Sequence, residues 1–450
     1  MMIGNKLSKH IAHPVWAMKD HSKVPAYLAE FETTQYYSSD QIRDYQLERL
    51  SVVVMRAYNE CPFYRESFDK AGVHPNDLKS LDDLSLFPML EKQDIQERRD
   101  DLISRSYAQN ELIENHTGGS TGSPLYYFHN KERMESRAAG TIRHDRWTGW
   151  DVGDWKATIW GAPQDMMSNR SLKSKLRSSI IDRTLWLNAT TVTEESILEF
   201  VKALNRYSPS MIVGYANALL LFSRYLKEHN LSVPPPKGVI STAEVLEDET
   251  RKIIEEAFGT KVFNRHGCRE VGLVASECAA HEGMHINSES LYVEFIKDGR
   301  PAKPGEVAEL VITDLWNFAM PFIRYRIRDM VAVEGKPCSC GRGLPLMKTV
   351  AGRVSEFLRA TDGTMVSGCS LSQFVVASLP AIKQAQVIQD RVDHVLFRIA
   401  KGLDYTDNDE NAVRGKVNEF LGSGMQCSFE YVDKILPEAS GKYRLTICRL

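Results

Sequence analysis

The feature that most limits how this chain can fold is an alternation of apolar runs and amphipathic stretches between residues 210 and 258. Ser210–Val213 and Lys237–Ser241 have the character of buried strands. Ala216–Leu226 and Asp248–Phe258 have the periodicity of helices. Strands that alternate with helices favour an α/β fold, in which helices cover both faces of a sheet.

The sequence on either side of this stretch predicts further elements. Apolar residues recur at helical spacing over Gln41–Cys61, and Pro62 ends that pattern. Glu306–Thr313 and Tyr325–Glu334 have the two-residue period of strands. Residues 354–450 hold a further set of strands and a helix, which is enough for a small α+β domain. We therefore predict two domains, residues 1–353 and residues 354–450.

The nearly balanced charge of the chain provides no long-range attraction for polyanions. Its 56 basic and 59 acidic residues give a net charge of -3, so no global positive field attracts nucleic acid or an anionic membrane, and any anion site must be local. No run approaches the roughly 20 apolar residues that span a bilayer. Residues 1–20 also lack the apolar core of a secretory signal. These features, with eight cysteines in a chain of 450 residues, predict a cytoplasmic protein in a reducing compartment, without membrane insertion.

The sharpest local signal is the segment His116–Pro124, with the sequence HTGGSTGSP. Its three glycines allow the backbone to approach an anion closely, and its hydroxyl side chains add hydrogen-bond donors, which suits a phosphate chain. A flexible surface loop is the alternative interpretation. The segment lacks the Gly-Lys-Ser/Thr ending of a Walker A loop, so it predicts a nucleotide site of another kind.

Thr117–Pro124 resembles the Ser/Thr- and Gly-rich loop of the adenylate-forming superfamily, which includes acyl-CoA synthetases, phenylacetate-CoA ligases, peptide synthetase adenylation domains and luciferases. The resemblance implies that ATP phosphates contact the following residues of the loop: Thr117, Ser120, Thr121 and Gly122. Ser123 replaces the lysine often found in this loop, which would weaken the contact to the departing pyrophosphate.

Two later segments resemble motifs of the same superfamily. His266–Glu270 is similar to its aromatic-Gly-x-Thr/Ser-Glu segment, which implies that His266 and Gly267 line the adenine pocket and that Glu270 helps to hold Mg²⁺. His266 and Arg269 depart from the usual residue types. Tyr325–Asp329 is similar to the Tyr-Arg-Thr-x-Asp segment, which implies that Asp329 binds both ribose hydroxyls. The nucleotide-binding set implied by the resemblance also includes Ala243 and Glu244.

The last two segments concern the C-terminal domain. Gly352–Glu356 resembles the Gly-Arg-x-Asp-Asp hinge, with Arg353 as a nucleotide contact and Ser355 where an aspartate is common. Ser440–Arg444 resembles the Ser-Gly-Lys motif, in which the lysine, here Lys442, contacts the substrate carboxylate and the phosphate. Each segment alone would also fit ordinary surface residues. The resemblance rests on five segments in the same order across some 330 residues.

A second group of residues suggests a metal site. Cys278-x-x-His281 and Cys338-x-Cys340 supply three thiolates and one imidazole, a set that suits tetrahedral Zn²⁺. Four protein ligands leave no open position, which predicts a structural role. Four reduced side chains without a metal are the alternative. His285 could instead face the nucleotide or be a buried structural histidine.

Within the superfamily, the chain is most similar to phenylacetate-CoA ligases and to their relatives encoded among capsular polysaccharide genes. The resemblance implies a large N-terminal domain with mixed sheets and a small mobile C-terminal domain. It also implies that ATP and Mg²⁺ convert a small-molecule carboxylic acid to an acyl adenylate, which coenzyme A then accepts. Relatives build the acyl pocket where four residues of this chain lie: Trp160, Gly161, Gly214 and Tyr215.

Core packing explains these aromatic residues equally well. An amine acceptor, in polysaccharide or natural-product assembly, and a nonenzymatic zinc-stabilised binding protein are the alternative functions. The sequence leaves the oligomeric state open, a homodimer included.

Overall fold

The computed structural model describes residues 2–117, 125–161, 181–189, 192–353, 357–368, 371–372, 375–376, 379–436 and 443–450. Contacts divide the chain into two compact units. Unit 1 comprises Met1–Lys156, Asn169–Thr184 and Phe263–Thr349. Unit 2 comprises Ala157–Ser168, Leu185–Val262 and Val350–Leu450. The domain boundary after Arg353 stays a prediction.

The helices of unit 1 begin where capping residues and prolines favour it. α4 (Ser39–Glu60) follows Ser38, whose Oγ accepts a hydrogen bond from the Gln41 N–H, while Gln41 Oε1 accepts one from the Ser38 N–H. α4 confirms the predicted helix, and Pro62 then begins α5 (Pro62–Ala71), because proline fits a first helical turn. The other α-helices are α1 (Met2–Leu7), α2 (His13–Lys19), α3 (Val24–Thr34), α6 (Lys92–Glu97) and α7 (Lys131–Arg146).

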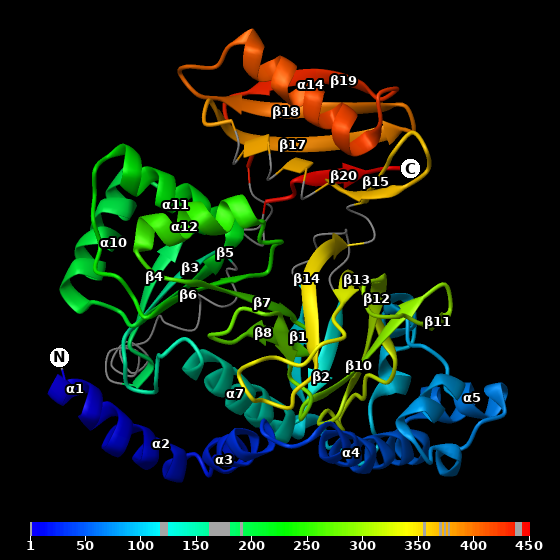
Figure 1. Ribbon diagram of the computed structural model, residues 1–450. Coiled ribbons are helices and arrows are strands. Elements are labelled where there is room, and N and C mark those ends of the chain that lie inside the picture. The colour runs from blue at the N-terminus through cyan, green and yellow to red at the C-terminus, as the bar shows by residue number, and fades with distance from the viewer. Residues whose placement is uncertain are drawn as a thin grey trace. The chain divides into compact units, whose positions relative to one another are not determined.

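Most strands of unit 1 lie in one sheet, in the order β11-β10-β12-β13-β14-β9-β8-β7. The pairs β10–β12, β12–β13, β14–β9, β8–β9 and β7–β8 are antiparallel. β12 and β13 confirm the two strands predicted between residues 306 and 334. Helices α3, α4 and α7 run along one side of this sheet (Figure 1). The bounds are β7 (Val262–Cys268), β8 (Gly272–Glu277), β9 (Met284–Ile286), β10 (Leu291–Lys297), β11 (Arg300–Pro301), β12 (Val307–Asp314), β13 (Tyr325–Val333) and β14 (Leu346–Arg353).

A separate hairpin in unit 1 flanks the glycine-rich segment. β1 (Ile113–His116) pairs antiparallel with β2 (Tyr126–His129), and His116 lies opposite Tyr126. The hairpin therefore brings His116 and Tyr126, which flank the glycine-rich segment, next to each other.

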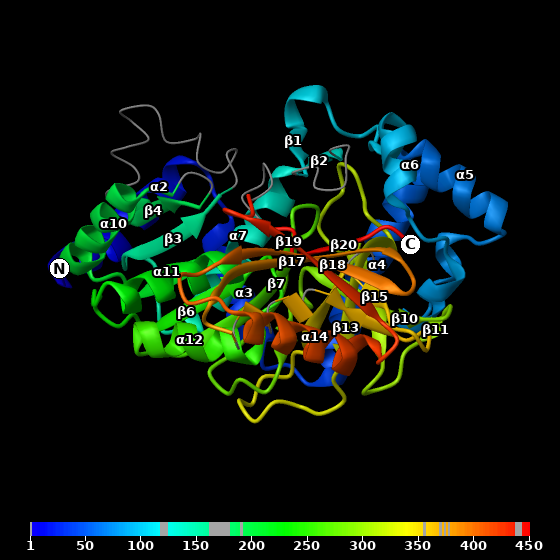
Figure 2. The same ribbon diagram turned by 90° about the horizontal axis from the view of Figure 1, so that it is seen from above.

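Unit 2 contains the strand and helix alternation predicted from the sequence. Its strands follow the order β6-β5-β3-β4, and β5 and β6 are parallel. Apolar side chains of the strands and helices share one core, which includes Ile212, Leu219 and Phe258. Figure 2 shows α10, α11 and α12 grouped beside these strands. The elements are β3 (Lys156–Trp160), β4 (Thr184–Asn188), α10 (Glu194–Tyr207), β5 (Met211–Tyr215), α11 (Ala216–Glu228), β6 (Gly238–Thr242) and α12 (Asp248–Phe258).

The C-terminal part of unit 2 has the α+β character predicted for it. A four-stranded sheet has the order β19-β18-β17-β20, and α14 packs on it through Val413, Val417 and Leu421. The elements are β15 (Phe357–Arg359), β16 (Met365–Ser367), β17 (Ile382–Arg391), β18 (His394–Lys401), α14 (Asp407–Leu421), β19 (Gln426–Val432) and β20 (Thr446–Cys448).

Among the described residues, none of the helices combines the length and the hydropathy that a bilayer-spanning segment needs.

Candidate active site and metal centre

The base of the glycine-rich segment is closed by hydrogen bonds. The Thr117 N–H donates to the Leu125 carbonyl over 3.0 Å, and the Leu125 N–H donates to Thr117 Oγ1 over 2.9 Å. Thr117 thus joins the two ends of the segment, and its proposed contact with a phosphate stays a prediction. The other predicted phosphate contacts lie outside the described residues: Ser120, Thr121 and Gly122.

The turn between β7 and β8 presents Glu270. A Cβ atom on Gly267 would lie 2.6 Å from the Gly272 carbonyl oxygen, so only glycine allows the two strands to approach this closely. His129 Nε2 lies 3.1 Å from the backbone carbonyl oxygen of Glu270, and the Tyr325 hydroxyl donates to Glu270 Oε1 over 3.3 Å. The turn is therefore held from two strands, β2 and β13.

A bulge in β13 presents Asp329. Glu309 of β12 faces Met330 and Val311 faces Arg326, so three residues of β13 lie opposite the single residue between them on β12. Arg328, inside this bulge, has φ +66°, which is uncommon for a residue with a side chain. Bulges of this kind re-aim side chains beside functional sites.

Asp329 and the β7–β8 turn meet in unit 1. His266 Nε2 lies 3.2 Å from Asp329 Oδ2, and both side chains are largely buried. Cys268 lies close enough for both carboxylates to act on it: burial raises the pKa of the Cys268 thiol, and the charges of Glu270 and Asp329 raise it further. The structure thus brings four residues into one neighbourhood: His266, Gly267, Glu270 and Asp329.

Two uncharged side chains, His129 and Tyr127, lie behind Glu270, with Arg133 and Arg137 close by. Burial, and then the charges of Arg133 and Arg137, lower the pKa of His129 to about 3. Burial, and then the charge of Glu270, raise the pKa of the Tyr127 phenol. Glu270 and Asp329 are carboxyl groups of this neighbourhood, and carboxylate oxygens suit a divalent cation and sugar hydroxyls.

Ala243 and Glu244 follow β6 in unit 2. Ala243 has φ +66°. Glu244 Oε2 accepts a hydrogen bond of 2.8 Å from the Asn217 N–H in the first turn of α11, and Glu244 Oε1 accepts one of 3.1 Å from the Tyr443 N–H. The residue that follows Lys442 is thus held at the end of β6.

The four residues predicted for the acyl pocket also belong to unit 2. The rings of Trp160 and Tyr215 lie 4.4 Å apart at 41°. Tyr215 is fully within the apolar core, and a Cβ atom on Gly214 would lie 2.9 Å from the side chain of Leu219. Gly161 is buried just after β3. The two rings contact each other, and their role toward a substrate stays a prediction.

For three of the predicted site residues the structure gives little or no information. Arg353 is the last residue of β14, and the structure describes its backbone alone. Ser355 and Lys442 lie outside the described residues. Their roles as hinge and catalytic lysine stay predictions.

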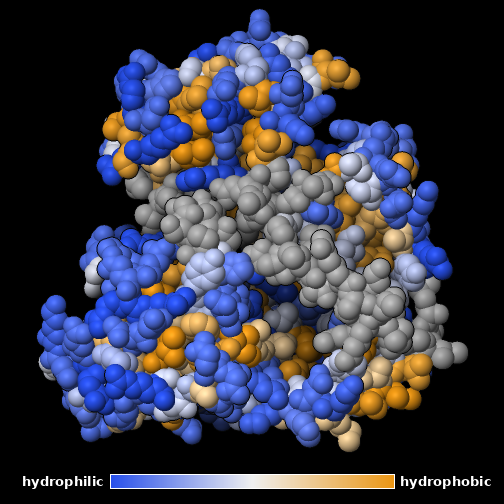
Figure 3. All heavy atoms as spheres, turned by 180° about the vertical axis from the view of Figure 1, so that it is seen from behind, coloured by the Kyte–Doolittle hydropathy of each residue, from blue (hydrophilic) through white to orange (hydrophobic). Residues whose placement is uncertain are grey.

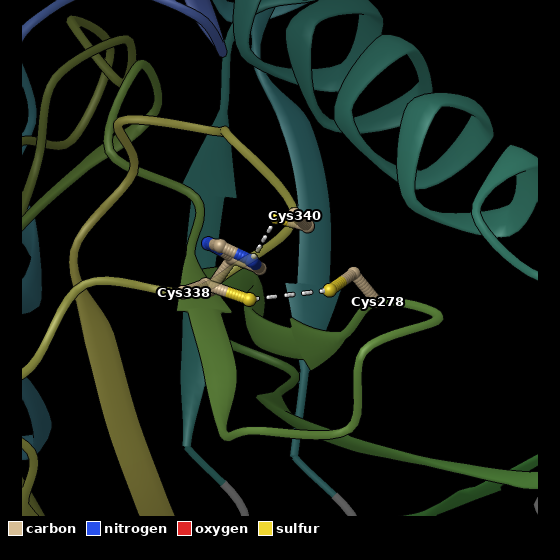
Figure 4. Close-up of side chains that lie close together, drawn as sticks. Cys278, Cys338 and Cys340 are labelled. Atoms are coloured by element: carbon tan, nitrogen blue, oxygen red, sulfur yellow. Dashed lines mark hydrogen bonds between the residues drawn. The ribbon is translucent and has the colours of Figure 1, made fainter.

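Three cysteines and one histidine form a compact cluster in unit 1 (Figure 4). The ligand atoms of Cys278, His285, Cys338 and Cys340 all lie within 4.8 Å of one another. Cys278 Sγ is 3.7 Å from Cys338 Sγ, and Cys340 Sγ is 3.3 Å from His285 Nε2. This set of donors matches the Cys₃His ligands of a tetrahedral structural zinc site.

The surroundings of His285 also suit a metal ligand. Its Nδ1 lies 3.1 Å from the Leu344 carbonyl oxygen, so the Nδ1–H donates there and the lone pair of Nε2 faces the thiols. Burial lowers the pKa of His285 to about 4, which keeps the imidazole neutral. The ring of Trp147 packs at 5.4 Å and helps to exclude water.

The prediction of His281 as a ligand is wrong. His281 Nδ1 lies 3.1 Å from Glu277 Oε2, and its ring packs against Phe263. His285 takes the position instead, because β9 pairs with β14 opposite Leu346 and so brings His285 beside the loop that carries Cys338 and Cys340. Antiparallel pairing between distant strands is not visible in the Cys-x-x-His spacing.

Comparisons with known proteins show sequence relatives of this chain. The family model described as the CapK C-terminal domain matches residues 358–449. Protein CapK of Staphylococcus aureus is 24% identical over 391 residues, which cover 86% of this chain and 84% of the relative. A phenylacetate-coenzyme A ligase of Aromatoleum evansii is 29% identical over 342 residues, which cover 73% of this chain and 74% of the relative.

A solved structure shares the fold. The structure of 2-hydroxyisobutyryl-CoA ligase in the postadenylation state, in complex with R3-HIB-AMP, has a TM-score of 0.75 and 18% sequence identity, and the match covers 92% of this chain and 90% of that chain.

Proposed function

Because this chain is a homologue of CapK and the phenylacetate-CoA ligases and has the fold of adenylate-forming ligases, we propose that it is an AMP-forming acid ligase. It uses ATP and Mg²⁺ to convert a carboxylic acid to an acyl adenylate and releases pyrophosphate. It then transfers the acyl group to coenzyme A, the acceptor in the names of the phenylacetate-coenzyme A ligases that it resembles.

The observation that carries this proposal is the meeting of the β7–β8 turn with the bulge of β13. His266 and Asp329 come from segments 63 residues apart, yet their side chains lie 3.2 Å from each other. Both strands distort at this place, β7 at Gly267 and β13 at Arg328. Distortion on both sides of one buried carboxylate supports a ligand site there.

The residues of unit 1 bind and orient the nucleotide in this mechanism. Asp329 accepts hydrogen bonds from the ribose hydroxyls, because a carboxylate offers two oxygens to two neighbouring donors. The backbone and hydroxyl groups of the glycine-rich segment hold the phosphates. Glu270, oriented by the Tyr325 hydroxyl, helps to hold Mg²⁺, which neutralises phosphate charge when it is bound.

In the first half-reaction an oxygen of the substrate carboxylate attacks the α-phosphorus of ATP. A bond forms between that oxygen and the α-phosphorus, and the bond to the bridging oxygen breaks, so pyrophosphate leaves with the electron pair. Lys442 stabilises the charge that develops between carboxylate and phosphate. Positioning and charge neutralisation dominate such a step.

In the second half-reaction the sulfur of coenzyme A attacks the acyl carbonyl carbon. A carbon–sulfur bond forms, the carbon–oxygen bond to AMP breaks, and the thiol proton passes to solvent. The sequence resemblance supports rotation of the C-terminal domain about Ser355 between the two half-reactions, which withdraws Lys442.

Exchange of labelled pyrophosphate into ATP tests the proposal. We expect exchange that depends on a carboxylic acid, in a screen over aryl, fatty and amino acids. Folded protein that gives no exchange with any acid would instead favour the nonenzymatic binding protein. Once an acid is found, coenzyme A and candidate amines are added separately, and the acceptor that produces stoichiometric AMP identifies the second half-reaction.

An amine acceptor, as in polysaccharide or natural-product assembly, is the second candidate. The match of residues 358–449 to the CapK C-terminal domain names no acceptor, so it leaves both coenzyme A and an amine open. Formation of an amide in the presence of an amine, with no thioester when coenzyme A replaces it, would support this alternative.

We also propose that the cluster of Cys278, His285, Cys338 and Cys340 holds a structural Zn²⁺. Its four donors complete a tetrahedral set, so no position is left for water or substrate. The ion would tie the loop after β8 and strand β9 to the loop before β14. It takes no part in the chemical steps.

A further inference from the structure

Residues 2–19 form one helical stretch although Pro14 interrupts the regular hydrogen bonds. α1 continues through the π-turn η1 (Ser8–Ala12) into α2, and both flanking positions, Leu7 and Ala12, keep helical backbone angles. Proline has no N–H to donate to the carbonyl four residues earlier. The wider π-turn absorbs that missing bond, so the side chains before and after it stay on common faces.

The face of this helix that contacts unit 1 is polar. Asn5 Nδ2 donates to Asp154 Oδ1 over 2.8 Å, Lys9 pairs with Asp151, and His13 Nε2 lies 3.1 Å from the Ile181 carbonyl oxygen. Gly153 permits this approach, because a Cβ atom there would lie 2.7 Å from the Asn5 carbonyl oxygen. The helix is therefore attached through hydrogen bonds and an ion pair.

The opposite face is apolar and exposed. Leu7, Ile11, Val15 and Met18 are spaced by four, four and three residues, and they are 55%, 55%, 60% and 77% exposed. Asn5, Lys9, His13 and Trp16 follow the same spacing on the attached face. In Figure 3, hydrophobic side chains gather at the lower right, in the region of α1 and α2. A helix on a globular protein usually has the reverse arrangement, with its apolar stripe toward the core.

Positive charge borders the apolar stripe. Residues 1–19 contain three lysines and no acidic residue, in a chain whose net charge is -3. Lys6 and Lys19 are exposed and lie on opposite flanks of the stripe at helical spacing, and Lys19 Nζ lies 5.3 Å from the centre of the Trp16 ring. Lys9 pairs with Asp151 on the attached face. An anionic surface matches both the stripe and its charges.

We propose that the helix of residues 2–19 lies on the surface of a bilayer that contains anionic phospholipids. Leu7, Ile11, Val15 and Met18 enter the boundary between headgroups and acyl chains, and Lys6 and Lys19 contact phosphate groups. At 1.5 Å per residue the helix is about 27 Å long and lies in the plane of the interface. The proposal does not depend on the ligase activity.

Flotation of the purified full chain with vesicles tests this proposal. We expect binding to phosphatidylcholine vesicles that contain about one third phosphatidylglycerol, and much weaker binding to phosphatidylcholine alone. Replacement of Ile11→Ser together with Val15→Ser removes apolar area and is expected to weaken binding at least about tenfold. Replacement of Lys6→Gln and Lys19→Gln is expected to weaken it about fivefold for each lysine at low salt.

The matched control is Leu403→Ser, since Leu403 is 99% exposed and lies in unit 2. It should bind vesicles as the parent chain does. Thermal unfolding checks that every variant is folded. If the serine variants do not fold, vesicle binding by the lysine variants still tests the proposal. Equal binding of parent and serine variants overturns the proposal. The proposal is also overturned if the parent chain does not bind vesicles and light scattering shows that it is a dimer while the serine variants are monomers. The apolar stripe would then contact a second copy of the chain.

Discussion

At the residue scale, the proposed adenylation step depends most on Lys442. Lys442→Ala removes a charge that acts on the transition state, and loss of one such group commonly costs about 2.7 to 4 kcal/mol. We therefore expect acid-dependent pyrophosphate exchange to slow at least about a hundredfold, with ATP affinity changed only severalfold. Isothermal titration measures the affinity.

Lys434→Ala is the matched control, since Lys434 is exposed and lies eight residues earlier. It should retain exchange. If the Lys442→Ala protein exchanges pyrophosphate at the parental rate, Lys442 has no role in adenylation. The position of Asp329 would then be the main support for an ATP site.

His129 predicts a dependence of stability on pH. Burial depresses the pKa of His129 in the folded state to about 3, whereas an unfolded histidine titrates near 6.5. Between these values the unfolded chain binds a proton that the folded chain does not. The free energy of unfolding should therefore fall as the pH drops below about 6.5, by up to about 1.4 kcal/mol per pH unit from this group.

Urea unfolding at pH 7, 6 and 5 measures this dependence. His129→Gln keeps a donor for the Glu270 carbonyl but cannot be protonated, so its slope against pH should be shallower. His10→Gln, at an exposed position, should keep the parental slope. An unchanged slope in the His129→Gln protein would contradict the assigned pKa.

At the scale of elements, the β7–β8 turn should tolerate no side chain at Gly267. A Cβ atom there would lie 2.6 Å from a backbone oxygen, so Gly267→Ala must separate the strands that position Glu270. We expect a loss of about 1 to 3 kcal/mol of stability and a rise in the Mg²⁺ concentration needed for exchange. Gly415→Ala in α14 is the control, because its Cβ atom meets nothing within 4 Å. Equal stability of the two variants would refute the crowding argument.

The metal centre gives a second prediction for elements. Protein purified without chelators should contain about one Zn²⁺ per chain, and Cys338→Ser should lose it. If the ion contributes at least about 2 kcal/mol, the Tm should fall by about 4 to 8 °C. Cys427→Ser, outside the cluster, should keep both the metal and the Tm. Parent protein without zinc, or a Cys338→Ser protein with the parental Tm, would rule out a structural ion.

At the scale of the whole molecule, the two half-reactions should respond differently to the hinge. Ser355→Pro fixes one backbone angle and restricts the preceding residue. We expect acyl transfer from the adenylate to slow at least about tenfold more than pyrophosphate exchange, measured by rapid quench.

Asp407→Pro is the control for proline itself in the C-terminal part. Asp407 is exposed at the first position of α14, where proline is well tolerated, and the preceding Thr406 already has the extended backbone that proline favours. This variant should leave both half-reactions at the parental rates. Equal effects of Ser355→Pro on the two half-reactions would argue against a hinge at Ser355.

Across the whole molecule, the helices and strands predicted from a strong hydrophobic periodicity agree with those in the structure. The helix predicted over Asp248–Phe258 has those same bounds, and the strands predicted between residues 306 and 334 correspond to β12 and β13. The formation of these helices and strands is determined mainly by residues that are close to one another in the sequence. The exposed stripe of residues 7–18 was not predicted, because its meaning depends on which face of the helix unit 1 covers.

The sequence by itself determined the fold class, the order of the main elements and the segments that resemble an adenylate-forming ligase, because local periodicity and short motifs are properties of neighbouring residues. Only the tertiary structure decided that His285 rather than His281 joins the three thiols, and that His266 meets Asp329. Those contacts follow from strand register and from bulges. If the strand register or a bulge shifts by one residue, a side chain moves to the opposite face of the sheet. Such contacts are therefore fixed by packing across the sheet and not by spacing along the chain.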